Sequence, residues 1–187
     1  YATLPEKKAA LHVNKTLLQD ITLHKGLLQQ LENKAASLSD KDSLARIKAT
    51  GKEYDNLLQS IEDKIAACED HIANHENFDA MLENFRDELL GLKNCFDETI
   101  SIDLMEPKNI EENIKFTQNI LNKRIPIDEK LGQSYQQLSI VMNQTHEKGH
   151  SELFNSFKEQ KDDWLKFIAA CEENKIKYET AKNQFDK

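Results

Sequence analysis

Apolar residues recur along most of the chain at alternating steps of four and three, the spacing of helices that bury one narrow stripe. In the middle of the chain this spacing defines a first seam, which consists of Tyr54, Leu58, Ile61, Ile65, Cys68, Ile72 and His75. A second seam follows it and consists of Phe78, Leu82, Phe85, Leu89, Leu92 and Phe96. The step from His75 to Phe78 is a three that follows a three, so the apolar stripe rotates around the helix at this point.

Few helix-breaking residues interrupt these two seams. No proline lies between Asp42 and Glu98, and Gly51 and Gly91 are the only glycines in that stretch. The sequence therefore predicts one unbroken helix of about 55 residues, about 80 Å long at the helical rise of roughly 1.5 Å per residue. Because its apolar face changes direction near His75, the helix must change packing partners there. We expect a junction between two helical bundles at that point.

A further helix is predicted before the long one. It begins near Pro5, which suits the first turn of a helix, and ends at the turn 37–43, where a serine or aspartate can cap the next helix. Its expected core positions are Leu11, Leu18, Ile21, Leu28, Leu31, Ala35 and Leu38.

Two more helices are predicted after 97–109, which is the least helical stretch of the chain. The expected core positions of the first are Ile110, Ile114, Thr117, Leu121, Ile125, Leu131, Tyr135, Leu138 and Met142. Pro126 falls inside this helix and should kink it, because proline removes a backbone hydrogen bond. After a break at 142–149, a final helix runs from about His146 to the end. Its expected core positions are Phe154, Phe157, Trp164, Ile168, Cys171 and Tyr178.

The chain also contains an internal repeat. The five residues IAACE occur at 65–69 and return at 168–172, 103 positions later. At this offset Tyr54 falls on Phe157, Ile61 on Trp164, Leu18 on Leu121 and Leu28 on Leu131. The match is imperfect, because Leu58 falls on Lys161 and Ile72 on Lys175. Agreement across more than one helix indicates a helical unit that is used twice.

The repeat length and local sequence resemble the spectrin-repeat family. The stretch LLQDITLHKGLLQQLENKAASL at 17–38 is similar to the family's second helix, with a histidine, His24, at a position where that helix often has one. KEYDNLL at 52–58 is similar to the start of the third helix. FDAMLENFRDELLGLK at 78–93 departs from the first helix of the family, because the usual tryptophan is absent.

This resemblance implies an all-α fold of tandem left-handed three-helix bundles, joined by a continuous helix. Residues 1–75 would form a partial repeat with helices B and C only, and residues 76–187 a complete repeat with helices A, B and C. The incomplete first repeat would expose its apolar seams, so we expect self-association or a bound partner segment there.

The resemblance also implies a non-enzymatic function. The family's members are rods of cytoskeletal linkers that set distance, bear tension and bind protein partners. The low tryptophan content is similar to that of the nesprins, giant proteins of the nuclear envelope. A nesprin-like parent would be cytoplasmic at the outer nuclear envelope and connect it to actin, with a formin or another actin regulator as partner. Dystrophin-like and plakin-like rods are the other subfamilies considered. The sequence does not identify the partner-binding residues.

Composition and charge fit this interpretation. Charged residues make up 31% of the chain and hydrophobic residues 39%, with five glycines and three prolines, as expected of long charged helices. The net charge of −8, with acidic and basic residues interleaved, argues against direct binding of nucleic acid or an anionic membrane. No apolar run is long enough to cross a bilayer. Cys68, Cys95 and Cys171 lack the spacing of a zinc site and fit reduced thiols.

Two histidine pairs are candidates for chemistry. HEKGH at 146–150 matches the zinc-peptidase motif, in which His146 and His150 would bind zinc and Glu147 would act as general base. Its place at a helix start and the lack of an evident third ligand argue against this, so we assign no catalytic, cofactor-binding or metal-binding residue. His71 and His75 are also one helical turn apart, but His75 lies on the seam and should be packed there. Because histidine titrates near neutral pH, a pH-sensitive junction at His75 is a second hypothesis.

Two non-enzymatic alternatives are a generic two-stranded coiled coil and a bundle that lies on a lipid surface. The breaks at 37–43, 97–109 and 142–149 argue against a continuous coiled coil. The interleaved charges argue against a lipid surface, which would favour lysine or arginine along one polar face.

Overall fold

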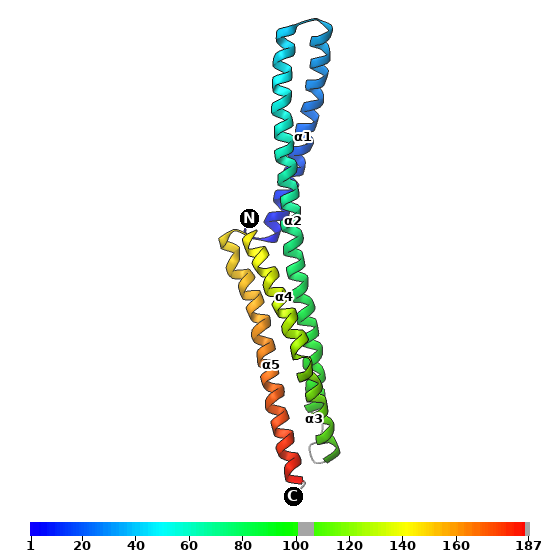
Figure 1. Cartoon of the computed structure of the whole chain (residues 1–187), viewed down its shortest axis with the longest axis vertical. Coiled ribbons are helices and arrows are strands. Elements are labelled where there is room, and N and C mark those ends of the chain that lie inside the picture. The colour runs from blue at the N-terminus through cyan, green and yellow to red at the C-terminus, as the bar shows by residue number, and fades with distance from the viewer. Residues whose placement is uncertain (101–106, 186–187) are drawn as a thin grey trace. The chain divides into compact units, whose positions relative to one another are not determined.

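The computed structural model describes residues 1–100 and 107–185. In chain order its elements are α1 (Leu4–Ser37), α2 (Lys41–Ile100), α3 (Pro107–Asn122), α4 (Arg124–Asn143), the short 3-10 helix η1 (Glu147–Gly149) and α5 (His150–Phe185) (Figure 1). The residues that it describes contain no strand, so the all-α class expected from the heptad spacing is confirmed. Two compact units can be separated, unit 1 (Tyr1–His75) and unit 2 (Glu76–Lys187). The relation between them by a 103-residue repeat stays a prediction.

Helix α2 belongs to both units. It is 60 residues long, and all residues from 70 to 80 are helical, so the unbroken helix expected from the absence of proline is confirmed. The expected break at 97–109 was too wide, because α2 continues to Ile100 and α3 begins at Pro107. The rest of that stretch, 101–106, lies outside the described residues.

In unit 1, α1 and the first part of α2 form a helical hairpin. The N-cap of α1 is Thr3, whose hydroxyl accepts a hydrogen bond from the Glu6 amide at 3.3 Å, with Pro5 in the first turn as expected. The turn to α2 contains Ser39, which has a positive φ of 58°. Asp40 then accepts bonds from the Ser43 amide at 3.1 Å and hydroxyl at 2.6 Å, so aspartate is the cap that the turn provides.

Contacts along the hairpin show that its two helices are antiparallel. Lys15 forms an ion pair with Glu69 at 2.7 Å, and Lys25 pairs with Asp55 further along. The side chain of Asn14 lies 3.8 Å from the sulfur of Cys68. Partners on α2 therefore move back along the chain as those on α1 move forward, as in a hairpin.

The hairpin buries only part of its apolar surface. Ile21 and Ala35 on α1 and Ile61 and Ile72 on α2 are buried, as the seams predicted. Leu31 and Leu38 were expected in the core, but the structure exposes both. Other large apolar side chains that are exposed in unit 1 are Tyr1, Val13, Leu17, Leu23, Leu27 and Leu57. Two helices alone can cover only one stripe of each other, which explains these exposed positions.

In unit 2, the second half of α2 packs with α3, α4 and α5 around one continuous core. All six residues of the second seam on α2 are buried, as expected. They join residues of the other helices in a cluster, which comprises Ile120, Ile127, Leu131, Leu138, Val141, Leu153, Phe157, Trp164, Phe167, Ile168 and Cys171. Edge-to-face ring contacts connect α2 to α5, with Phe85 6.4 Å from Trp164 and Phe96 5.5 Å from Phe167 between ring centroids. The predicted core positions Phe78, Phe85, Phe157 and Trp164 are therefore confirmed.

The helix predicted around Pro126 is broken rather than kinked. α3 ends at Asn122 and α4 begins at Arg124, with a turn at Lys123 whose amide bonds to the Ile120 carbonyl at 3.0 Å. Pro126 is the third residue of α4, where its missing N–H has no helical partner to lose. The break also shifts the core register, because Ile127 is buried while the predicted core residue Ile125 is exposed.

Candidate functional site

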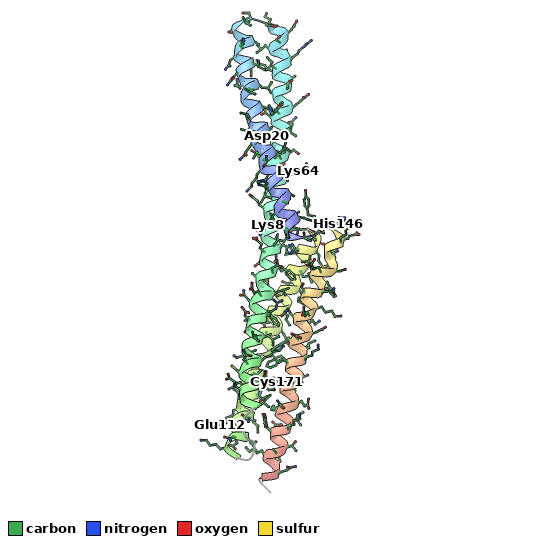
Figure 2. The ribbon with its side chains drawn as sticks, turned by 180° about the vertical axis from the view of Figure 1, so that it is seen from behind. Lys8, Asp20, Lys64, Glu112, His146 and Cys171 are labelled. Atoms are coloured by element: carbon green, nitrogen blue, oxygen red, sulfur yellow. The ribbon has the colours of Figure 1, made fainter. Side chains whose placement is uncertain are left out.

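The HEKGH motif does not form the helical arrangement that a zinc peptidase requires. His146 precedes η1 as its N-cap with extended backbone, and its Nδ1 accepts a bond from the Lys148 amide at 3.3 Å. His150 begins α5, so the motif lies across a turn, at the start of α5 (Figure 2). The two imidazoles therefore do not stand one turn apart on one helix face.

The hydrogen bonds of His150 also oppose metal binding at Nε2. This nitrogen lies 2.9 Å from the carbonyl oxygens of both Met142 and Thr145. Because carbonyl oxygens only accept, Nε2 must carry the proton, and its lone pair is not free for a metal. His150 thus ties the end of α4 to the start of α5. Within residues 1–100 and 107–185, no group of three or more His, Cys, Asp or Glu side chains is placed to hold a metal ion.

The other histidine pair lies at the end of unit 1. His75 is buried, as its seam position predicted, and its Nδ1 lies 3.4 Å from the Nζ of Lys7, which is itself only 1% exposed. An ammonium can only donate, so Nδ1 accepts and its lone pair faces Lys7 rather than His71. This arrangement does not fit a metal site formed by His71 and His75. The pH-sensitive junction stays a prediction.

The three cysteines are free thiols in different environments. Cys95 is exposed, Cys68 is half-buried, and Cys171 is buried in the core midway along α5 (Figure 2). Burial raises the pKa of the Cys171 thiol to about 12, with a smaller contribution from the charge of Glu172. A buried thiol with so high a pKa is a packing residue and not a nucleophile.

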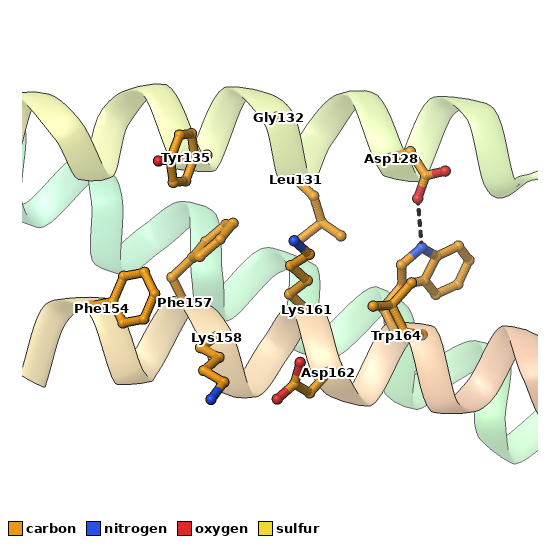
Figure 3. A pocket seen from close by; sticks show the side chains of 11 residues that line it. Asp128, Leu131, Gly132, Tyr135, Phe154, Phe157, Lys158, Lys161, Asp162 and Trp164 are labelled. Carbon is orange, nitrogen blue, oxygen red and sulfur yellow. Dashed lines mark hydrogen bonds between the residues drawn. The ribbon is translucent and has the colours of Figure 1, made fainter.

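A concave site lies between α4 and α5 in unit 2, where it forms a groove (Figure 3). We call it the α4–α5 groove, and its volume is about 780 Å³. Its lining residues are Asp128, Leu131, Gly132 and Tyr135 from α4 and Phe154, Phe157, Lys158, Lys161, Asp162, Trp164 and Leu165 from α5. Such a volume lies within the range of binding pockets in proteins, roughly 300 to 1,000 Å³.

The groove has a rigid apolar floor. Leu131, Phe157 and Trp164 are buried members of the unit 2 core. At one end the ring of Tyr135 packs at a tilt against Phe157, with ring centroids 5.6 Å apart and an angle of 49° between the rings. At the other end the indole nitrogen of Trp164 donates to Asp128 at 2.8 Å, as the dashed line shows (Figure 3). The floor is held at both ends by α4–α5 contacts.

The walls of the groove expose apolar side chains to solvent. Tyr135 is 53% exposed and Phe154 46% exposed, and Leu165, which follows Trp164 on α5, is also exposed. Tyr135 and Phe154 were predicted as core residues, and the structure corrects both assignments. Leu153 takes the core position instead of Phe154, so the register of α5 differs by one residue at its start.

The charges of the groove divide into paired and unpaired groups. Asp128 accepts from Trp164 through Oδ1 and pairs through Oδ2 with Arg124 at 3.7 Å. Lys158, Lys161 and Asp162 form no hydrogen bond or ion pair with any residue that the structure describes. Lys161 projects from α5 toward α4 in the middle of the groove, while Lys158 and Asp162 lie along its outer edge (Figure 3).

Sequence reasoning did not find this groove, although one signal was available. At the 103-residue offset Lys161 falls on the seam residue Leu58, so a lysine replaces an apolar residue where two helices should meet. A charged residue at such a position prevents close packing and leaves a depression above the core.

The fold defines an all-α helical-bundle protein, and neither histidine pair has the geometry of a metal or peptidase site. Among proteins of known sequence, the chain is 33% identical over 186 residues to Muscle-specific protein 300 kDa of Drosophila melanogaster. The match includes 100% of this chain but only 2% of that protein. No protein-family model and no solved structure matches the chain. The helical fold and this match fit the spectrin-like resemblance and are consistent with a non-enzymatic structural segment.

Hydropathy gives no indication of a membrane span. None of the helices in the described parts of the chain combines the length and apolar character required to cross a bilayer.

Proposed function

We propose that this chain is a non-enzymatic, spectrin-like rod segment that acts as a spacer and as a docking scaffold for proteins. The observation that carries this proposal is α2, a helix of 60 residues that supplies core residues to both compact units. Ile61 and Ile72 of α2 are buried in unit 1, and Phe78 and Leu82 of the same helix are buried in unit 2. The two units are therefore connected without a flexible linker.

A shared helix has mechanical consequences. When tension unfolds unit 1, the backbone hydrogen bonds of α2 must break up to the start of unit 2. Because helix formation is cooperative, the two parts of α2 do not unfold independently. The packing of unit 2 then resists further fraying of the same helix. A chain with this construction resists extension better than two bundles joined by a flexible segment.

The finer proposal concerns the parent protein. The nesprin-like sequence features support a parent that connects the nuclear envelope to actin, in which this segment lies in the cytoplasm at the outer nuclear membrane. A formin or another actin regulator would then be a partner. The match to a much larger muscle protein supports a parent that is itself far longer than this segment. Direct binding of a purified formin fragment to the chain tests the partner assignment.

Self-association through unit 1 is a separate part of the proposal. Leu23 and Leu27 are exposed one turn apart on α1, and Leu31 continues the same stripe. A second copy of the chain that covers this stripe would bury these leucines, each worth about 1.5 to 3 kcal/mol when fully buried. Sedimentation equilibrium should detect a dimer, and the double variant Leu23→Gln, Leu27→Gln should be monomeric. Ile176→Gln, at an exposed apolar position of α5, serves as the control; a wild-type monomer would refute this part.

The spacer function is tested by single-molecule force spectroscopy on the full chain. Asn77 is an exposed residue of α2 at the start of unit 2, so its side chain can be changed without altering the core. Asn77→Pro should cost about 3 kcal/mol of local helix stability. We expect the wild-type units to unfold in coupled events and the proline variant to unfold in two separate events, the first at lower force. Asn77→Ala should behave like the wild type. Identical traces for the wild type and Asn77→Pro would refute the mechanical role of α2.

A further inference from the structure

We propose that the α4–α5 groove is a docking site for an amphipathic helix of a protein partner, with acidic residues beside its apolar face. This inference deepens the docking part of the proposed function and rests on it. The spacer part depends on α2 and is tested by a different experiment, so the two can fail independently.

The apolar surface of the groove is in excess of what the fold needs. Unit 2 already has a continuous core, to which Leu131, Phe157 and Trp164 contribute. Tyr135, Phe154 and Leu165 add exposed apolar surface directly above it. Aromatic residues are enriched at protein interfaces and often anchor them. A partner that inserts two or three apolar side chains would cover them.

Gly132 keeps one wall of the groove open. A Cβ atom added at this position would meet nothing within 4 Å, so the packing of the chain itself does not require glycine there. Glycine in a helix interior costs about 1 kcal/mol relative to alanine. The same open space surrounds Gly26, Gly51 and Gly91, so Gly132 does not by itself indicate a partner; it leaves the α4 wall low enough for one to approach. Gly132 lies between Asp128 and Tyr135 on the groove side of α4.

The unpaired charges favour an acidic partner. Three lysines of unit 2 pair with carboxylates on neighbouring helices: Lys93 with Asp163, Lys130 with Glu88 and Lys182 with Glu111. Lys158 and Lys161 have no such partner among the described residues. Asp128 is already engaged by Trp164 and Arg124, which leaves Asp162 as the single unpaired carboxylate of the groove. Carboxylates beside the apolar face of a partner helix would form ion pairs with Lys158 and Lys161.

The backbone of the groove favours a helix over an extended peptide. Both walls are α-helices, whose amides and carbonyls are bonded internally along the groove. An extended peptide would find no strand edge to pair with, whereas a helix satisfies its own backbone. The wall from Phe154 to Leu165 spans eleven residue steps, about 16 Å at 1.5 Å per residue. About three turns of a partner helix match this length.

A selection experiment on the full chain tests the proposal. The probe is a display library of helical peptides of about 16 residues, in which apolar positions recur at i, i+4 and i+7 and the flanking positions are random. Peptides enriched on the wild-type chain should carry Asp or Glu at flanking positions. Their affinity, measured by fluorescence anisotropy, should fall at least about tenfold with Lys158→Glu, Lys161→Glu and should weaken as salt increases.

Two glycine variants provide a matched pair. Gly132→Leu places a side chain in the groove and should abolish binding, although leucine is a better helix former and should raise the melting temperature. Gly91→Leu makes the same change at an exposed glycine of α2 outside the groove, where a Cβ also meets nothing within 4 Å, and should leave binding unchanged. Loss of binding with increased stability cannot result from misfolding.

Several results would overturn the proposal. The first is a selection in which no peptide is enriched on the wild-type chain, and the second is enrichment of basic or uncharged peptides. The third is peptide binding that is unchanged in the Gly132→Leu variant. Sedimentation that shows a dimer sensitive to Gly132→Leu would assign the groove to a second copy of the chain instead. Binding to phosphatidylserine vesicles that is lost with Lys158→Glu, Lys161→Glu would assign it to a lipid surface.

Discussion

The indole nitrogen of Trp164 donates a hydrogen bond to Oδ1 of Asp128 at 2.8 Å, which joins a core residue of α5 to the surface of α4. Trp164 is only 1% exposed, so its N–H has little access to water. Asp128 in turn pairs with Arg124, and Arg124 donates to Glu172 on α5 at 3.0 Å. This chain of contacts positions the floor of the α4–α5 groove relative to its wall.

Asp128→Ala should destabilise unit 2 by about 1 to 3 kcal/mol, because it leaves the buried indole N–H without an acceptor. Asp128→Asn should cost less, since the amide oxygen still accepts. In a Trp164→Phe background no indole N–H remains, so Asp128→Ala should then cost little, and the double-mutant cycle should be strongly non-additive. Urea unfolding followed by circular dichroism measures each difference. Additive effects would show that the bond does not contribute to stability.

Much of the fold could be predicted from the sequence because long helices bury regular stripes. The second seam on α2 is buried at every position, and the unbroken helix follows from the absence of proline between Asp42 and Glu98. Asp40 as a helix cap was one of two residue types expected in its turn. These features depend on local spacing and on residue chemistry, which a single sequence displays directly.

The candidate site could not be predicted in the same way. Heptad spacing placed Tyr135 and Phe154 in the core, but an aromatic residue at a seam edge can face the core or the solvent. The turn at Lys123 and the start of α5 at His150 set the register of α4 and α5, and each shifts the buried positions by one or two residues. Ile127 and Leu153 consequently replace Ile125 and Phe154 in the core. A groove between helices depends on these registers and on tertiary packing.

The contribution of the turn between α1 and α2 to the stability of unit 1 should depend on pH. Hydrogen bonds from the Ser43 hydroxyl and amide lower the pKa of Asp40 below its usual value. A lowered folded-state pKa contributes stability above the unfolded pKa, near 4, and this stability is lost as the pH falls through the lower folded value. Melting of the wild type and of Asp40→Asn should therefore differ at pH 6 and converge toward about pH 2. A constant difference would show that Asp40 does not act through its charge.

Asn113 on α3 is a buried polar residue whose replacement should stabilise unit 2. It is 1% exposed, and its side-chain nitrogen has no hydrogen-bond partner among the residues that the structure describes. A buried donor without a partner costs about 1 to 3 kcal/mol. Asn113→Leu should raise the free energy of unfolding by about 1 kcal/mol after allowance for differences in packing. Asn119→Leu, at an exposed position of the same helix, should change it little. A lower free energy of unfolding for Asn113→Leu would contradict the conclusion that the buried side-chain nitrogen of Asn113 is an unsatisfied donor.

The three thiols should react in an order set by burial. Cys95 is exposed and should react with a maleimide first, and half-buried Cys68 should follow. Cys171 is buried with a pKa of about 12, so at pH 8 the thiolate fraction is about one in ten thousand even before access is considered. We expect Cys171 to be labelled only when unit 2 unfolds, so its rate should rise with urea in parallel with unfolding. Mass spectrometry of Cys95→Ser and Cys171→Ser variants assigns each label. Fast labelling of Cys171 without denaturant would show that α5 separates from the core in the native state.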